Sequence, residues 1–204
     1  MLRALYQRGR DWLRRFAADQ RGGILAETGI LLPVITLIIL SGTEIGRFTL
    51  LQQKLNRAAV TMSDLIAQTD SNISLTQVAN LYQAAGFVMR PFDLTTNGVI
   101  IVSSVVRTSG NPPTVNWQCV GAGSLAATSQ LGTSGSTATL PTGFILRDGE
   151  SAIFAEVVYA YEPFVAPDLI GSTTLRHESM FRPRFGALAA LAPGAVPPGA
   201  PNCT

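Results

Sequence analysis

One of the most apolar runs in the chain lies near its N-terminus. Sixteen uncharged residues, 28–43, separate Glu27 from Glu44 and include the run LLPVITLIIL. As a helix this run measures about 24 Å, and the longer stretch from Gly23 to Gly46 measures about 36 Å, against a hydrocarbon core of about 30 Å. The pattern therefore predicts a membrane-spanning helix that carries one glutamate near each boundary.

The helical spacing continues beyond this span. Apolar residues recur every three or four positions, at Phe48, Leu51, Leu55, Ala58 or Ala59, Met62, and Leu65 or Ile66. Polar residues fill the opposite face, so we expect one continuous helix over 23–68, about 69 Å long, whose second half packs on a head outside the membrane. Pro33 predicts a bend, because a proline inside a helix removes one hydrogen bond and clashes with the preceding turn.

A second helix is predicted over 75–89, with Ser74 as its cap and Pro91 beyond its end. The pattern then changes to short β-branched and aromatic segments between turn signals. We expect strands within 98–108, 113–120, 143–147, 151–164 and 172–183. A helix followed by an antiparallel meander is the α+β class. Within 151–164 the apolar positions alternate with a set that includes Glu156, which predicts one more polar face.

Two segments lack either pattern. Residues 121–143 are rich in Gly, Ser and Thr and are predicted to form an exposed loop, and the tail at 186–204 is rich in Ala, Pro and Gly. The predicted organisation is therefore a basic leader at 1–22, an anchor helix at 23–68, a head at 69–185 and the tail at 186–204.

Composition supports an anchored or exported protein. Charged residues make up 14% of the 204 residues and the mean hydropathy is +0.27, whereas soluble domains contain about 25% charged residues. The net charge of +2 and a single lysine, Lys54, argue against nucleic-acid binding. Six arginines and two aspartates precede the span, which predicts a cytoplasmic N-terminus. The alternative is a removable secretory signal, although no A-x-A-like site follows the apolar run.

Two cysteines, Cys119 and Cys203, lie far apart and show no metal-ligand spacing. Export favours a disulfide between them, which would hold the tail on the head and contribute about 4 kcal/mol in the chain-entropy model. Two free thiols are the alternative.

No catalytic arrangement is predicted. His177, the single histidine, stands beside Glu178 with no GxSxG or HExxH motif, and is interpreted as a surface residue. The segment GAGSLA at 121–126 fits a dinucleotide pattern but has no βαβ setting. Asp148 and Glu150 flank a glycine in a turn, where solvation explains them. The sequence therefore predicts no enzyme, no cofactor, no metal and no small-molecule substrate.

The N-terminal third resembles the TadE-like family, the minor pilins or pseudopilins of tight-adherence type IV pilus systems. The resemblance rests on Gly22 and Gly23 after a basic leader, on Glu27 and the LLP at 31–33, and on Glu44, Gly46 and Arg47 followed by QQ at 52–53 and NRAA at 56–59. It is close over 21–65 and looser at VNWQC, YAYEPF and FRPR.

The resemblance implies a processing site and an assembly contact. A prepilin peptidase would cut between Gly22 and Gly23, and Glu27 would then pair with the new amine of a neighbouring subunit. Implied partners are the bacterial inner membrane, other pilins and the pilus assembly platform, with the head in the periplasm or in a surface pilus. The chain carries Thr28 where the family usually has an aromatic residue. Two alternatives stay open: a permanently anchored periplasmic binding module of secretion machinery, and, less favoured, an anchored hydrolase.

Overall fold

A computed structural model describes residues 15, 21–69, 73–165, 167, 171–186, 191–192 and 200–204 of the chain. The chain divides into two compact units, Met1–Gly46 and Arg47–Thr204. The fold is α+β, as the pattern predicts: a long apolar helix and a second helix are followed by an antiparallel sheet of five strands.

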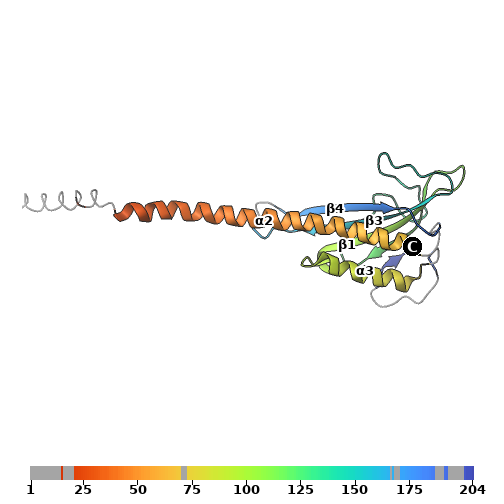
Figure 1. The fold of residues 1–204 in the computed structure, drawn as a ribbon, viewed down its shortest axis with the longest axis horizontal. Coiled ribbons are helices and arrows are strands. Elements are labelled where there is room, and N and C mark those ends of the chain that lie inside the picture. The colour runs from red at the N-terminus through yellow and green to blue at the C-terminus, as the bar shows by residue number, and fades with distance from the viewer. Residues whose placement is uncertain are drawn as a thin grey trace, which may run out of the picture. The chain divides into compact units, whose positions relative to one another are not determined.

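Helix α2 spans Arg21–Ala67 without interruption (Figure 1). It continues through Pro33, and it confirms that the apolar run and the amphipathic run form one helix. The side chains of 22–43 are all exposed, whereas Leu51, Leu55 and Ile66 in the second half are fully buried. This change follows the sequence, because only the second half alternates apolar and polar faces.

Helix α3 spans Leu75–Met89, and the short helix α4 spans Leu94–Asn97. Ser74 begins α3 with a capping box: its hydroxyl accepts from the backbone N–H of Gln77, and the Gln77 side chain accepts from the backbone N–H of Ser74. Asp93 caps α4 by accepting from the backbone N–H of Thr95. The predicted position of the second helix is confirmed.

The strands are β1 (Gly98–Val106), β2 (Thr114–Gly121), β3 (Ser151–Tyr161), β4 (Thr173–Phe181) and β5 (Asn202–Cys203). Their order in the sheet is β4-β3-β1-β2-β5, and every neighbouring pair is antiparallel. The predicted meander is wrong, because β1 lies between β2 and β3. The long connection from β2 to β3 carries the chain to the other side of β1.

One further expectation is wrong, and one strand has no counterpart in the sequence pattern. Residues 143–147 form no strand, because Phe144 and Leu146 pack on the sheet from the long connection without pairing to a strand. The tail does contain a strand, β5, which pairs with the outer edge of β2. The pattern of the tail could not show this, because two residues are too few to carry a periodicity.

Both faces of the sheet are covered. Helices α2 and α3 cover one face (Figure 1), where Ile153, Val157 and Tyr159 of β3 belong to the main core. On the opposite face, Phe154 packs with Leu131 and Leu146 from the β2–β3 connection. Residues 122–143 form a loop, as predicted, but Leu131 and Ala138 within it are buried against the sheet. Its few apolar residues bury the face that the sequence marked as more polar.

Candidate functional site

The most unusual surface of the described chain is the first half of α2. Its large apolar side chains are mostly exposed, as Leu25 at 77% and Ile38 at 66% illustrate. The helix over Gly22–Ala67 is long and apolar enough to cross a membrane, and its most apolar window has a mean hydropathy of 2.2. An exposed apolar surface of this extent marks a membrane or protein contact, and it is compatible with single-pass anchoring.

The polar groups of this segment are arranged for an apolar environment. Three threonine hydroxyls donate to backbone carbonyls of the helix itself: Thr28 to Ile24 at 2.7 Å, Thr36 to Leu32 at 2.8 Å and Thr43 to Leu40 at 2.8 Å. Each hydroxyl proton is thus used within the helix and needs no water. Glu27 is the one charged residue between Gly22 and Thr43.

The predicted processing site lies on the same helix. Gly22 and Gly23 are exposed, and a Cβ added at either would meet nothing within 4 Å. Glu27 follows Gly23 by four residues, which is about 6 Å along a helix, and its side chain is exposed. The predicted cleavage site and the carboxylate are therefore both exposed on this helix. Of the leader residues before Gly22, the structure describes only Arg15 and Arg21.

Aromatic rings fix the start of the head half of α2. The Arg47 guanidinium lies 6.0 Å from the ring centroid of Phe92 and 5.9 Å from that of Tyr161. The Phe48 ring meets Tyr161 edge-on at 5.3 Å. Cation–π and edge-to-face contacts of this kind hold the helix against the end of β3 and against the segment between α3 and α4.

Polar contacts fix the rest of α2 on strand β4 and on the segment after it. His177 Nε2 makes a hydrogen bond with the Gln52 side chain, and Arg184 forms an ion pair with Asp64 at 3.1 Å. His177 is half-buried. Its ring faces α2 because every second side chain of β4 lies on the face of the sheet that α2 covers, and it contacts Gln52 there.

Glu156 lies in the middle of β3 and is 1% exposed. Its carboxylate accepts hydrogen bonds from Arg176 Nη1 at 2.6 Å, from the backbone N–H of Gln130 at 2.9 Å and from the Ser129 hydroxyl. Arg176 also donates to the carbonyl of Thr128 at 2.8 Å. Both carboxylate oxygens accept hydrogen bonds, so the side chain ties the long connection to β3 and β4.

The cysteines lie at the opposite edge of the sheet. Cys119 and Cys203 form a disulfide across the β2–β5 pair, with 84 residues of sequence separation. The Tyr82 hydroxyl of α3 donates to the carbonyl of Cys119 at 2.7 Å. Burial raises the pKa of Tyr82 well above its ordinary value, so the phenol stays protonated at neutral pH.

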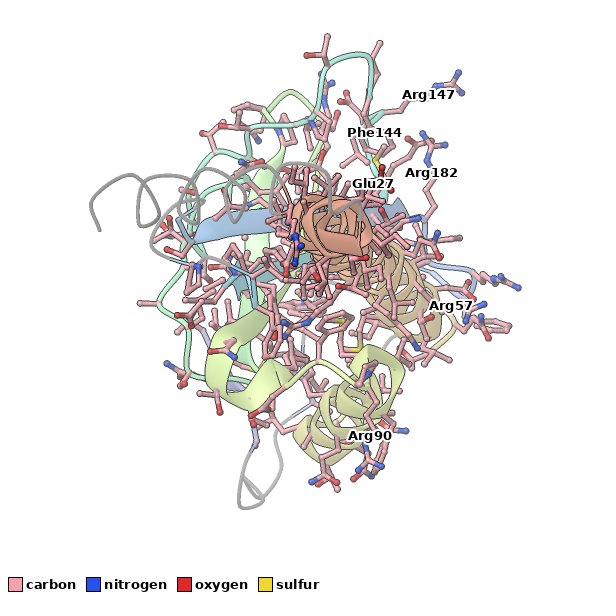
Figure 2. The ribbon with its side chains drawn as sticks, turned by 90° about the vertical axis from the view of Figure 1, so that its left-hand side faces the viewer. Glu27, Arg57, Arg90, Phe144, Arg147 and Arg182 are labelled. Carbon is pink, nitrogen blue, oxygen red and sulfur yellow. A yellow bond between two sulfur atoms is a disulfide. The ribbon has the colours of Figure 1, made fainter. Side chains whose placement is uncertain are left out.

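The remaining motifs have structural explanations. In GAGSLA, a Cβ at Gly123 would lie 2.1 Å from the carbonyl oxygen of Gly98, so this glycine permits backbone packing and leaves no room for a phosphate. Asp148 pairs with Arg107 at 2.8 Å. Arg182 lies 3.3 Å from Glu150 and 5.9 Å from the ring of Phe144, toward which it extends in Figure 2. Within the described ranges no group of three or more metal-ligating side chains occurs.

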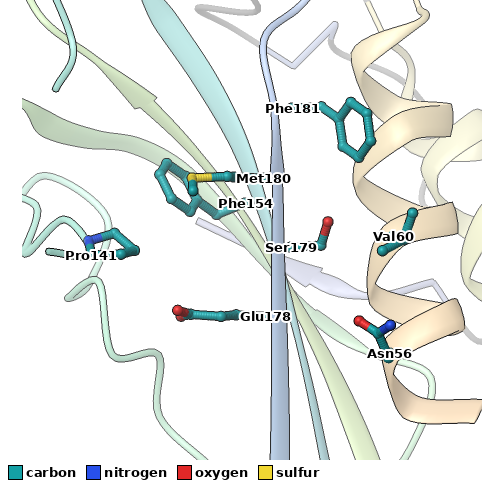
Figure 3. Close-up of a pocket in the computed structure, with 8 residues that line it drawn as sticks. All are labelled: Asn56, Val60, Pro141, Phe154, Glu178, Ser179, Met180 and Phe181. Carbon is teal, nitrogen blue, oxygen red and sulfur yellow. The ribbon is translucent and has the colours of Figure 1, made fainter. Parts of the chain in front are cut away.

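Two shallow grooves mark the head. One, of about 400 Å³, lies along the C-terminal half of β4 (Figure 3). The other, of about 370 Å³, lies where α3 meets α4 and includes Phe87, which is 65% exposed, with Arg90 at 4.9 Å from its ring. Neither groove contains a pair of acid and base side chains in hydrogen-bond contact.

Comparison with models of protein families, with curated proteins and with solved structures finds no match for this chain. The functional assignment therefore depends on the residues of the apolar helix and on the contacts of the head.

Proposed function

We propose that this protein is a membrane-anchored minor pilin or pseudopilin-like subunit of a tight-adherence type IV pilus system. One observation carries the proposal: a single helix is apolar and exposed in its first half and forms the core of an α+β head in its second half. Such a helix joins an apolar segment suited to a membrane to a folded head, which is what an assembly subunit requires. The arginine-rich leader supports an N-terminus in the cytoplasm and a head in the periplasm.

Glu27 gives the assembly step its chemistry. A charge in the middle of a bilayer costs about 2.5–3.5 kcal/mol, and less near the interface. Cleavage between Gly22 and Gly23 would create an amine at Gly23, and the Glu27 carboxylate of a neighbouring subunit would pair with it. An opposite charge on the partner removes part of the cost, so the pair favours helix-to-helix packing over dispersal in lipid.

One feature of the sequence favours a second candidate. Thr28 replaces the aromatic residue that usually follows this glutamate in the TadE-like family. Without cleavage no amine forms at Gly23, and the protein would act as a permanently anchored module that binds periplasmic partners of secretion machinery. The two candidates differ in the state of a single peptide bond.

The first experiment determines the N-terminus of the protein extracted from membranes of its native host. Intact mass and N-terminal sequencing should find a chain that begins at Gly23. As a control, Gly22→Phe should abolish this product, because the leader glycine is the residue that the peptidase would recognise. A wild-type chain that retains Met1 would reject the pilin proposal in favour of the anchored module.

The second experiment tests the role of the carboxylate. Glu27→Gln should impair incorporation into the sheared surface fraction while alkaline extraction still recovers the protein with the membrane. Glu44→Gln is the matched control, because it removes the same charge at the other boundary of the same apolar run. Equal incorporation of wild type and Glu27→Gln would show that the proposed pairing is wrong.

A further inference from the structure

The two edge strands of the sheet, β2 with β5 and β4, differ in whether other segments pair with their outer backbone. Two segments cover the outer edge of β2. In residues 202–204, strand β5 pairs with Cys119 and Val120, and Thr204 exchanges two hydrogen bonds with Gln118 at 2.8 and 2.9 Å. Residues 135–138 bond to Pro113 and Val115. No comparable segment of the described chain bonds to the backbone of β4 from outside the sheet. The edge formed by β4 is therefore open in the part of the chain that the structure describes.

The hydrogen-bond register shows which groups the open edge offers. Gln118 bonds outward to Thr204, so its partner Ser103 in β1 directs its N–H and C=O toward β3. Arg107, four residues after Ser103, directs its backbone to the same side and bonds to Gly149 and Glu150, which directly precede β3. Antiparallel pairs alternate between bonded and non-bonded. The same alternation applies to the pair β1–β3 and then to the pair β3–β4. It directs the N–H and C=O groups of four residues of β4 away from the sheet: Thr174, Arg176, Glu178 and Met180.

The groove of about 400 Å³ gives this edge side walls (Figure 3). Val60 and Asn56 of α2 lie on one side of β4 with Phe181. Pro141 of the long connection lies on the other side with Met180, which is 41% exposed. An extended chain laid against β4 would therefore direct alternate side chains toward α2 and toward Pro141.

Charge defines the chemistry of the occupant. Glu178 is exposed and stands directly opposite Glu156 on β3. Arg176 already pairs with Glu156, and no ion pair joins Glu178 to another described residue. A basic side chain placed opposite Glu178 would compensate its charge, since opposite charges across a strand pair stabilise it.

We propose that the outer edge of β4 binds an extended segment of a partner polypeptide by strand addition, and that this segment places a lysine or arginine opposite Glu178 and an apolar residue opposite Met180. The main-chain hydrogen bonds give affinity and the groove gives selectivity for the side chains. This function of the head goes beyond the proposed assembly role of the anchor helix, and cleavage at Gly22 does not bear on it.

Two other occupants fit less well. A second copy paired by a two-fold axis would reverse the direction of its strand β4. Helix α2 runs alongside β4 in the same direction, since Gln52 meets His177 and Asp64 meets Arg184. The head halves of α2 in the two copies would then run in opposite directions, so the two chains could not both be anchored in one membrane. This step alone relies on the proposed anchoring. Sheet extension from β4 of one copy to β2 of the next is blocked by β5.

Hydrogen exchange of the full-length protein in detergent micelles tests the proposal. In dilute protein the amides of Thr174, Arg176, Glu178 and Met180 should exchange rapidly, while those of the alternate residues are protected by β3. The probe is a short acetylated peptide that alternates valine with threonine and has lysine at its centre. It should slow the four outward amides by about tenfold or more, whereas a copy of the peptide N-methylated on its pairing amides should leave them unchanged.

Two variants separate backbone pairing from charge. Glu178→Pro removes an outward N–H and should abolish peptide protection without lowering the melting temperature, because proline is tolerated where the N–H faces away from the sheet. Ser179→Pro is the matched control and should lower the melting temperature, since its N–H bonds to β3. Glu178→Lys should retain the fold and reverse the preference from the lysine peptide to the matching glutamate peptide.

Four outcomes would overturn the proposal. Slow exchange of the outward amides in dilute free protein would mean that the chain covers its own edge. Protection that rises with protein concentration alone would identify a second copy as the occupant. Equal protection by the N-methylated peptide, or none by either peptide at about 1 mM, the weak limit of specific binding, would exclude strand addition.

Discussion

Glu156 provides the most direct test of how the long connection is held on the sheet. The substitution Glu156→Ala removes a carboxylate that is 1% exposed and accepts from Arg176, Gln130 and Ser129. It leaves one guanidinium, one backbone N–H and one hydroxyl without that acceptor. The connection at 122–150 should then detach around Ser129, and Phe154 should lose part of its cover.

The structure sets the size of the effect. Removal of one partner of a buried ion pair costs about 3–5 kcal/mol, because the other charge stays buried. Arg176 is 22% exposed and can turn toward water, so we expect the lower end, about 3 kcal/mol. A domain of ordinary stability has a free energy of unfolding of about 5–15 kcal/mol. The variant should therefore fold, with a clearly reduced free energy of unfolding.

Denaturant unfolding in detergent measures this change through the emission of Trp117, which is 4% exposed, in a Trp12→Phe background. The matched control is Glu178→Ala, which removes the exposed glutamate opposite Glu156 and should change the free energy of unfolding by less than about 0.5 kcal/mol. Glu156→Ala combined with Arg176→Ala should cost less than the sum of the single losses by more than about 1 kcal/mol. A loss below about 1 kcal/mol for Glu156→Ala, or simple additivity, would refute this account.

Three further predictions concern the head. Reduction of the bond between Cys119 and Cys203, which closes a loop of 84 residues' separation, should lower the free energy of unfolding by about 4–5 kcal/mol, and Cys203→Ser should reproduce the loss without reductant. Because burial raises the pKa of Tyr82 above its ordinary value of 10.0, the unfolded chain releases this proton first; stability should fall as pH rises above 10, and Tyr82→Phe should flatten that fall in a pH series of melting curves. Gly123→Ala should destabilise the head by about 1–3 kcal/mol, because its Cβ would lie 2.1 Å from a carbonyl oxygen, whereas Gly86→Ala, in an open helical position, should stabilise it by about 0.5–1 kcal/mol in the same denaturant assay.

Local periodicity accounts for most of what could be predicted about the elements. The spacing of Leu51, Leu55 and Met62 requires a helix with one buried face, and these residues are buried in the core. Ser74 and Pro91 bracket the second helix because a capping hydroxyl and a missing N–H act on adjacent backbone groups. Most strands were predictable for the same reason. The exceptions are 143–147, whose apolar residues pack on the sheet without pairing, and β5, which is too short to carry a periodicity.

The candidate site divides in the same way. The apolar surface, Glu27 and the two glycines belong to one continuous helix, so their accessibility could be read from the sequence. The saturation of Glu156 could not be, since its donors lie 20 to 27 residues away along the chain. The one available signal was a glutamate in the middle of an otherwise apolar strand, which demands a partner of unknown identity if that face is buried.

The sequence by itself determined that this protein has an exposed apolar helix joined without a break to an α+β head, because hydrophobic burial and backbone capping act over a few residues. Only the tertiary structure decided the strand order, the burial of both sheet faces and the difference between the closed edge at β2 and the open edge at β4. These features depend on which distant segments meet. Pairing energies are similar for many registers, and the choice among them is made by packing of the whole head.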